Sequence, residues 1–302
     1  MLHLVPAAPP ARVPVYSGFD YVTVDSARGR VYAAHTGSNR LVVVDSRTGR
    51  VRGQVRVGPL HGVAVDPKSG DVFTGNGSEQ TVSKVDPRTL RVVAQTSVPG
   101  PVDALIYDPS SSRVYADEDG GSRIFVIDAN TLKQVGTIAS PGSDPEYLAV
   151  DPKAGLLYQN LNDLDAFAII DTHTLKVRRI VKTPQLRHNH PLQFDARLGQ
   201  LIVGGKNGVL SVYTPAGKHV GDVRVQPDLD QCSLDDAGDL LACAGAQTLT
   251  VYRLEAGKAP RLVAKLTTGK RVHTVAIDGK TKQVWTVWAD GRGDWAQGYT
   301  IQ

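Results

Sequence analysis

Seven ionisable side chains recur at one position of a repeat along this sequence. Each lies five residues before an aspartate that ends a short apolar run. The seven, called the ring residues below, are Asp20, His61, Asp103, Glu146, His190, Asp230 and His273. The chain has only 30 Asp and Glu and 8 His among 302 residues, so seven matches in seven repeats are improbable by chance. Imidazoles and carboxylates that converge in this way can bind a divalent transition metal.

The aspartates that end the apolar runs mark a regular repeat. Successive ones are 41, 42, 43, 44, 40 and 43 residues apart. Each unit continues with a turn and two further apolar strands, such as DPKSGDVFTGN and then TVSKVD, and six units add a fourth strand, such as RVVAQTSV. Four short strands in about 40–45 residues are typical of a propeller blade. The sequence predicts an all-β fold, a seven-bladed β-propeller with four-stranded antiparallel blades.

The two ends of the chain are expected to complete one blade together. The seventh unit reaches Gln302 before a fourth strand can form. We expect residues 11–17 (ARVPVYS) to supply that strand, so that an N-terminal strand completes the last blade and leaves no open sheet edge. Residues 1–302 then form a single β-propeller domain, with residues 1–10 as a flexible lead-in.

The innermost strand of each blade should carry the ring residues to one mouth of the axial channel. We therefore predict His61, His190 and His273 as metal ligands, with Glu146 as the fourth. Such a site suits Zn, Mn, Ni, Fe or Cu, whereas Ca would leave the histidines unused. A solvated mouth without any ligand is the simpler alternative, but turn capping by acidic residues does not require histidine.

The other ring residues and their neighbours are predicted to support this site. Glu146 and Asp20 are the candidate catalytic carboxylates. Asp103 and Asp230, like Asp20, are expected to orient the imidazoles as hydrogen-bond acceptors. The aromatic residues that directly follow two ring residues either turn a phenol toward the mouth or pack between blades, and packing is the favoured role; they are Tyr21 and Tyr147.

Loop residues on the same face are further candidates for substrate binding. His35 ends the second strand of the first unit and should lie beside the mouth. Arg187 and His188 lie in the segment RHNH just before the fifth ring residue, where Arg187 either clamps an anionic substrate or remains a surface charge. Trp288 and Trp295 are expected to line a pocket on this face. The segment DEDGG, residues 117–121, is expected to be a solvated turn.

Composition and motifs exclude several classes of protein. The net charge of +4 is spread over the turns, so no nucleic-acid partner is expected. No apolar stretch is long enough to span a membrane, and MLHLVPAAPPARVP is not an evident signal peptide. There is no GxSxG, Walker, GxGxxG or CxxC motif, and spacing alone does not support a Ser–His–Asp triad. The sequence does not determine the oligomeric state.

The two cysteines fall on the first two strands of the sixth unit. Cys232 and Cys243 are predicted to be buried free thiols. A disulfide between them is the alternative, and it would indicate an oxidising compartment.

Two segments identify a family resemblance. HGVAVDPKSGDVFTGN and YVTVDSARGRVYAAHTGSNRLVVVDSRTG resemble the YVTN-type β-propeller repeat, and the resemblance extends over residues 18–302. The last three units lose the V-I-D ending of the repeat. The resemblance implies relatives such as streptogramin lyases, lactonases, quinoprotein-like dehydrogenase subunits and noncatalytic binding proteins. It also suggests a periplasmic or secreted location.

Together these features predict a metal-dependent enzyme that acts on a small-molecule substrate at the mouth of the axis. Lewis-acid or general-base chemistry, in a lyase or a lactonase-like hydrolase, suits both the ligands and the resemblance. The alternative is a noncatalytic propeller that binds a metal, a cofactor or a partner.

Overall fold

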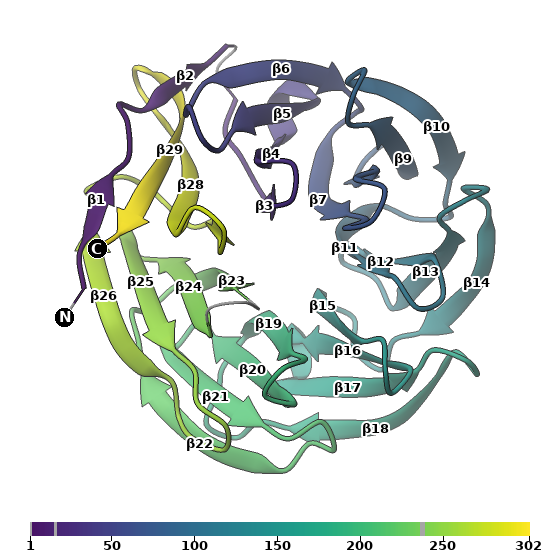
Figure 1. The fold of residues 1–302 in the computed structure, drawn as a ribbon. Coiled ribbons are helices and arrows are strands. Elements are labelled where there is room, and N and C mark those ends of the chain that lie inside the picture. The colour runs from purple at the N-terminus through teal and green to yellow at the C-terminus, as the bar shows by residue number, and fades with distance from the viewer. Residues whose placement is uncertain (1, 15–16, 236–238) are drawn as a thin grey trace.

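The computed structural model describes residues 2–14, 17–235 and 239–302. Seven antiparallel sheets follow one another around a central axis (Figure 1). In blades one to six, four strands pair in sequence order from the axis outward. This arrangement confirms the predicted all-β, seven-bladed propeller. Within the described ranges, no helix has the length and apolar character needed to cross a membrane.

The strands of each blade are as follows. Blade one contains β3 (Val22–Asp25), β4 (Arg30–His35), β5 (Arg40–Asp45) and β6 (Val51–Arg56). Blade two contains β7 (Leu60–Val65), β8 (Val72–Asn76), β9 (Thr81–Asp86) and β10 (Arg91–Ser97). Blade three contains β11 (Val102–Asp108), β12 (Arg113–Glu118), β13 (Arg123–Asp128) and β14 (Gln134–Ala139). Blade four contains β15 (Pro145–Asp151), β16 (Leu156–Leu161), β17 (Ala166–Asp171) and β18 (Lys176–Lys182).

The remaining blades complete the ring. Blade five contains β19 (Asn189–Asp195), β20 (Gln200–Gly205), β21 (Val209–Tyr213) and β22 (His219–Arg224). Blade six contains β23 (Leu229–Asp235), β24 (Leu240–Gly245), β25 (Thr248–Arg253) and β26 (Arg261–Thr267). Blade seven contains β27 (Val275–Asp278), β28 (Gln283–Asp290) and β29 (Gly293–Ile301), with β1 (Leu4–Pro6) and β2 (Ala11–Val13) outside them. Two short 3₁₀ turns are η1 (Thr36–Ser38) and η2 (Asn162–Leu164).

The repeated aspartates shape the turn after each inner strand. In blade four, Asp151 Oδ1 accepts hydrogen bonds from the backbone N–H groups of Lys153 (3.0 Å) and Ala154 (3.1 Å). Asp195 makes the same pair of bonds in blade five. An aspartate that bonds to the backbone two and three residues ahead stabilises a tight turn. This local role explains why the aspartate recurs with the period of the blades.

The hydrophobic core lies between neighbouring blades rather than within one. For example, Tyr32 and Leu41 of blade one pack with Leu60 and Val72 of blade two, and all four are fully buried. Alternating apolar residues on the middle strands supply both faces of each blade. Each inner strand is therefore held at a defined distance and angle from the axis.

Two N-terminal strands close the ring against the C-terminal strand. Leu4 pairs with Ile301 in β1, and Ala11 pairs with Ala296 in β2 (Figure 1). An N-terminal strand thus completes the last blade, as predicted. The pairing begins at Leu4, earlier in the chain than expected, so part of the predicted flexible lead-in is a strand. This segment is ordered because the Leu4 side chain packs into the hydrophobic cluster between blades six and seven. Residues 15–16 of the predicted closing segment lie outside the described residues.

A buried aspartate ties the two ends of the chain together. Asp294 of β29 accepts hydrogen bonds from the backbone N–H groups of Ser17 (2.7 Å) and Gly18 (3.1 Å). The same carboxylate pairs with His35 Nε2, and both side chains are completely buried. Blade one and blade seven are therefore joined by polar contacts as well as by strand pairing.

The cysteines are bonded, so the prediction of two free thiols is wrong. Cys232 of β23 and Cys243 of β24 are directly opposite in the strand register, with their Cα atoms 4.1 Å apart. That separation is slightly below the usual range of about 4.4–6.8 Å between bridged Cα atoms. Sequence spacing alone could not establish this register.

Removing this disulfide should destabilise the protein. Replacing both Cys232 and Cys243 by alanine is expected to cost about 2–4 kcal/mol, because the bond restricts the unfolded chain and the small side chains leave a gap in a buried cluster. Denaturant unfolding of the variant and of the oxidised wild type would measure the loss. Superimposable unfolding curves would contradict the expectation.

Candidate functional site

Strand irregularities direct the ring residues toward the axis. In five blades the register of the innermost strand pair shifts beside the ring residue, for example between Glu146 and Leu148 in blade four. A β-bulge of this kind re-aims a side chain and is common next to functional sites. In blades one and seven the ring residues Asp20 and His273 lie two residues before the inner strand begins. The ring residues thus gather at the start of the inner strands.

The first group at the mouth comprises Asp20, His61 and Asp103. His61 Nδ1 lies 2.6 Å from Asp20 Oδ2 and 3.6 Å from Asp103 Oδ1. One ligand atom from each residue lies within 4.8 Å of the other two, and this is the one such group of His, Cys, Asp and Glu in the described part of the chain. Tyr21 Oη donates a long hydrogen bond to Asp103 Oδ2 (3.5 Å). Two carboxylates and an imidazole therefore face a common point.

Asp20 shifts the pKa values of both other members of this first group. Burial, followed by the negative charge of Asp20, raises the pKa of Asp103 to about 7. The hydrogen bond to Asp20 raises the pKa of His61 above its ordinary value. A bound cation would remove the repulsion between the carboxylates, because it interacts favourably with both.

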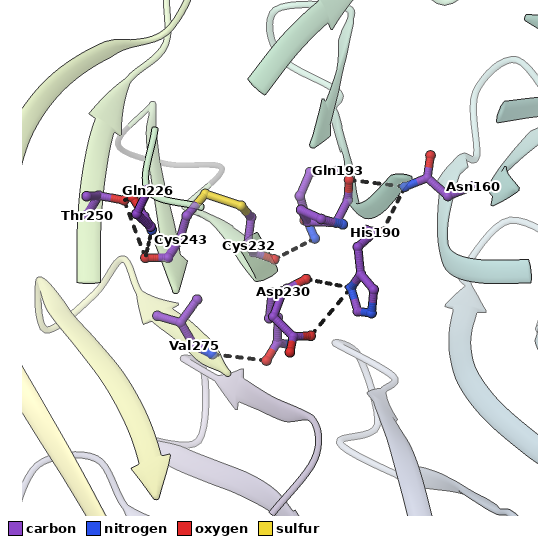
Figure 2. Close-up of a disulfide and its surroundings, with 11 residues drawn as sticks. Asn160, His190, Gln193, Gln226, Asp230, Cys232, Cys243, Thr250 and Val275 are labelled. Atoms are coloured by element: carbon purple, nitrogen blue, oxygen red, sulfur yellow. Dashed lines mark hydrogen bonds and ion pairs between the residues drawn. A yellow bond between two sulfur atoms is a disulfide. The ribbon is translucent and has the colours of Figure 1, made fainter. Parts of the chain in front are cut away.

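The second group joins Glu146, His190, Asp230 and His273. His190 Nε2 lies 3.2 Å from Glu146 Oε2, and its Nδ1 lies 2.8 Å from the carbonyl oxygen of Asp230 and 3.4 Å from the carboxylate. The other carboxylate oxygen of Asp230 lies 3.3 Å from His273 Nδ1. Figure 2 shows His190 directed at Asp230, two residues before the disulfide-bonded Cys232. Asp230 thus contacts both imidazoles.

The side chains of this second group have pKa values shifted in different directions. Burial lowers the pKa of His190, whereas the hydrogen bond to Asp230 raises the pKa of His273. Burial pushes the pKa of Asp230 upward, but hydrogen bonding to His273 and the charges of both histidines outweigh it and hold the pKa below its ordinary value. Burial, reinforced by Asp103, raises the pKa of Glu146 to about 9. With a pKa of about 9, the Glu146 carboxyl is protonated at neutral pH.

The structure brings the predicted ligands to one mouth but not into one ligand set. His61 belongs to the first group, and His190 and His273 belong to the second. The phenol rings of Tyr21 and Tyr147 are tilted by 48° with 5.1 Å between their centroids, and the ring of Tyr147 lies 5.9 Å from that of His190. The two tyrosines pack against each other, so the favoured packing role is present. Both rings line one crevice together with Asp20 of the first group and Asp230 and His273 of the second.

Asp117 is a component of the site that the sequence pattern missed. It is fully buried on β12, and it accepts hydrogen bonds from the backbone N–H of Ala104 (2.7 Å) and from Gln159 (3.4 Å). Burial, Asp103 and Glu146 all raise its pKa. The prediction of a solvated turn is therefore wrong for Asp117 and for the buried Glu118, because the strand continues through both. The signal in the sequence that could have identified Asp117 is the adjacent acidic pair, Asp117 and Glu118, at the end of an apolar strand.

The loop residues proposed for substrate binding make their contacts elsewhere. His35 bonds to Asp294 and to Ser38 Oγ (2.7 Å), which places it in the closure of the ring. Arg187 donates to the carbonyl oxygens of Pro184 (2.8 Å) and Leu186 (2.5 Å). These contacts hold its guanidinium against its own loop.

The remaining candidates are also engaged in structural contacts. His188 Nδ1 lies 3.0 Å from Asn162 Oδ1. Trp288 is buried in the cluster between blades six and seven. Trp295 donates through Nε1 to Asp290 (3.2 Å) at the outer part of blade seven. Their contacts assign them to the loops and the core rather than to a pocket at the mouth.

Comparisons with known proteins identify the fold and no family. No protein-family model and no curated protein matches the chain. It is similar in structure to the Kuenenia stuttgartiensis hydrazine synthase, with a TM-score of 0.79 and 16% identity over 94% of this chain and 97% of that one. It is also similar to the RRP9 WD40 repeats, with a TM-score of 0.86 and 8% identity over 100% of both chains. At these identities the likeness shows a seven-bladed β-propeller and nothing about activity.

Proposed function

We propose that the mouth of the axis binds a divalent metal ion through Asp20, His61 and Asp103 and supports chemistry on a small molecule. The observation that carries the proposal is the convergence of these three ligand atoms within 4.8 Å of one another. One imidazole and two carboxylates suit Zn, Mn, Fe or Ni, with Cu a further option and Ca a poorer one. Such an ion, when bound, polarises a carbonyl group or lowers the pKa of a coordinated water.

The second group would supply proton transfer beside the metal. Glu146 holds a proton at neutral pH, and His190, its neighbour at 3.2 Å, has a lowered pKa and is neutral. An acid and a base within hydrogen-bond reach of each other are the parts needed for lactone hydrolysis or for an elimination reaction. The likeness to the YVTN-type repeat also supports a lyase or a lactonase-like hydrolase. The disulfide is in keeping with a periplasmic or secreted location.

A noncatalytic metal-binding propeller is the second candidate. The observation in its favour is that His190 and His273 are already paired with carboxylates, as they would be in a static network. The Glu146→Gln variant separates the two functions, because the amide keeps the shape of the side chain and cannot donate the carboxyl proton. For an enzyme, turnover of lactones and simple esters should fall by about 10²–10⁴-fold while the metal is retained. Unchanged turnover, or no turnover by the metal-loaded wild type, would favour the binding protein.

Metal retention provides the direct test of the site. Protein purified without added ions and then dialysed with Zn or Mn should keep about one equivalent, and the His61→Ala variant should lose it, because three ligand residues form the site. His219→Ala is the matched control, since His219 pairs with an aspartate on the exposed outer strand β22. Elemental analysis gives the occupancy. Equal occupancy in the wild type and in His61→Ala would place the metal elsewhere.

A further inference from the structure

Tyr147, which follows the ring residue Glu146, has an unusual backbone conformation. Its φ is 52°, in the left-handed region, and it lies inside strand β15 at the register shift of blade four. Every other non-glycine residue with a positive φ in the described ranges lies outside the strands. A bulky side chain in this conformation costs free energy, and such strain is concentrated at functional sites. The strain shows that the fold holds this side chain in place against a local preference.

The hydroxyl group of Tyr147 is buried without a hydrogen-bond partner among the described residues. The side chain is 6% exposed, and burial raises its pKa well above the ordinary value, so the group stays a protonated donor. The buried hydroxyls of Tyr32 and Tyr115 differ, because they lie next to Arg30 and Arg113. The charged neighbours of Tyr147 are carboxylates. A buried donor without a partner is costly and calls for an explanation.

The surroundings of Tyr147 open toward solvent at the mouth. The residue lines a narrow crevice that is too small for a water molecule. Its other walls include Asp20, Asp230 and His273, whose side chains are 32%, 33% and 42% exposed. Access of a ligand to the phenol therefore requires these rim side chains to rotate away from it. A ligand atom that entered here would lie beside the first group as well, because Asp20 belongs to both.

We propose that the Tyr147 phenol donates a hydrogen bond to the carbonyl oxygen of a bound neutral ligand at the axis. The donor requires an acceptor, and the surrounding carboxylates would repel an anionic one, so an ester or amide oxygen fits best. Any reaction of the bound carbonyl group rests on the proposed function, since a metal at Asp20 would polarise that same group. The hydrogen bond to Tyr147 itself does not require the metal.

Removing only the hydroxyl group tests this role by stability and by binding. The Tyr147→Phe variant should melt at the same temperature as the wild type or higher, because an unpaired buried polar group is lost. Its affinity for γ-butyrolactone should fall about tenfold or more. Tyr115→Phe is the matched control, as it removes another buried tyrosine hydroxyl away from the axis and should leave that affinity unchanged. A clear loss of thermal stability in Tyr147→Phe, or undiminished affinity, would overturn the proposal.

A spectroscopic measurement separates this role from that of the metal. In full-length protein labelled with 3-fluorotyrosine, the ¹⁹F resonance that is missing from Tyr147→Phe should shift on addition of γ-butyrolactone or N-methylacetamide. The same shift should persist in His61→Ala. If zinc is retained and this resonance does not move with either probe, the role of Tyr147 is wrong and the metal site stands. If zinc is not retained and the resonance still moves, the metal proposal alone fails.

Discussion

The Asp294→Ala variant should lose about 3–5 kcal/mol of unfolding free energy, the largest effect of any single substitution considered for this protein. The variant leaves His35 completely buried without its carboxylate partner. It also removes the acceptor for the backbone N–H groups of Ser17 and Gly18. Because these contacts join the first blade to the last, the loss should appear as a lower midpoint in a single cooperative denaturant transition.

A surface pair of the same chemistry provides the control for Asp294. Asp222 pairs with His219 at 2.8 Å, but the two side chains are 38% and 44% exposed. Exposed ion pairs contribute about 0–1 kcal/mol, and Asp222 also accepts a hydrogen bond from Ser211 Oγ (2.7 Å), so Asp222→Ala should cost about 1–2 kcal/mol, well below the loss in Asp294→Ala. Equal effects of Asp294→Ala and Asp222→Ala would show that the buried pair does not close the ring.

The stability of the metal-free protein should fall as the pH rises from about 5 to 9, and Glu146→Gln should reduce this dependence. Glu146 has its pKa raised to about 9 by burial and by Asp103, whereas its ordinary value is 4.5. Between these values the folded state binds a proton that the unfolded state has released. Each pH unit in this window therefore costs up to about 1.4 kcal/mol of unfolding free energy. The stabilising effect of the protonated carboxyl is complete below the ordinary pKa and is lost by about pH 9.

Denaturant unfolding at several pH values, with a chelator present, would measure the effect of Glu146. The amide of Glu146→Gln does not titrate, so the decline with pH should become shallower, although Asp103 and Asp117, whose pKa values are also raised, would keep part of it. Glu255→Gln is the matched control, because Glu255 is 44% exposed beside Lys258 and its pKa is lowered. Parallel stability profiles for the wild type and Glu146→Gln would mean that Glu146 is ionised in the folded protein.

The sequence predicted those features that each blade produces locally. An aspartate such as Asp151 bonds to the next few backbone N–H groups, so its 40–44-residue recurrence marks the blades directly. Strand alternation and turn chemistry then predict four strands per blade, and closure by the N-terminal segment follows from the missing strand. The position five residues before each aspartate identified the ring residues, because the start of each inner strand lies at one mouth of the axis.

Only the tertiary structure decided which of these residues act together. The partners are far apart in sequence, as in His61 with Asp20 or His190 with Asp230, and their distances depend on the register shifts and on how neighbouring blades pack. No local pattern reveals that the rings of Tyr21 and Tyr147 pack together, or that Asp117 is fully buried and that Asp103 raises its pKa. Burial is also what keeps a proton on Glu146. Local sequence thus determined where the ionisable groups lie, and long-range packing determined their pairing and their charge.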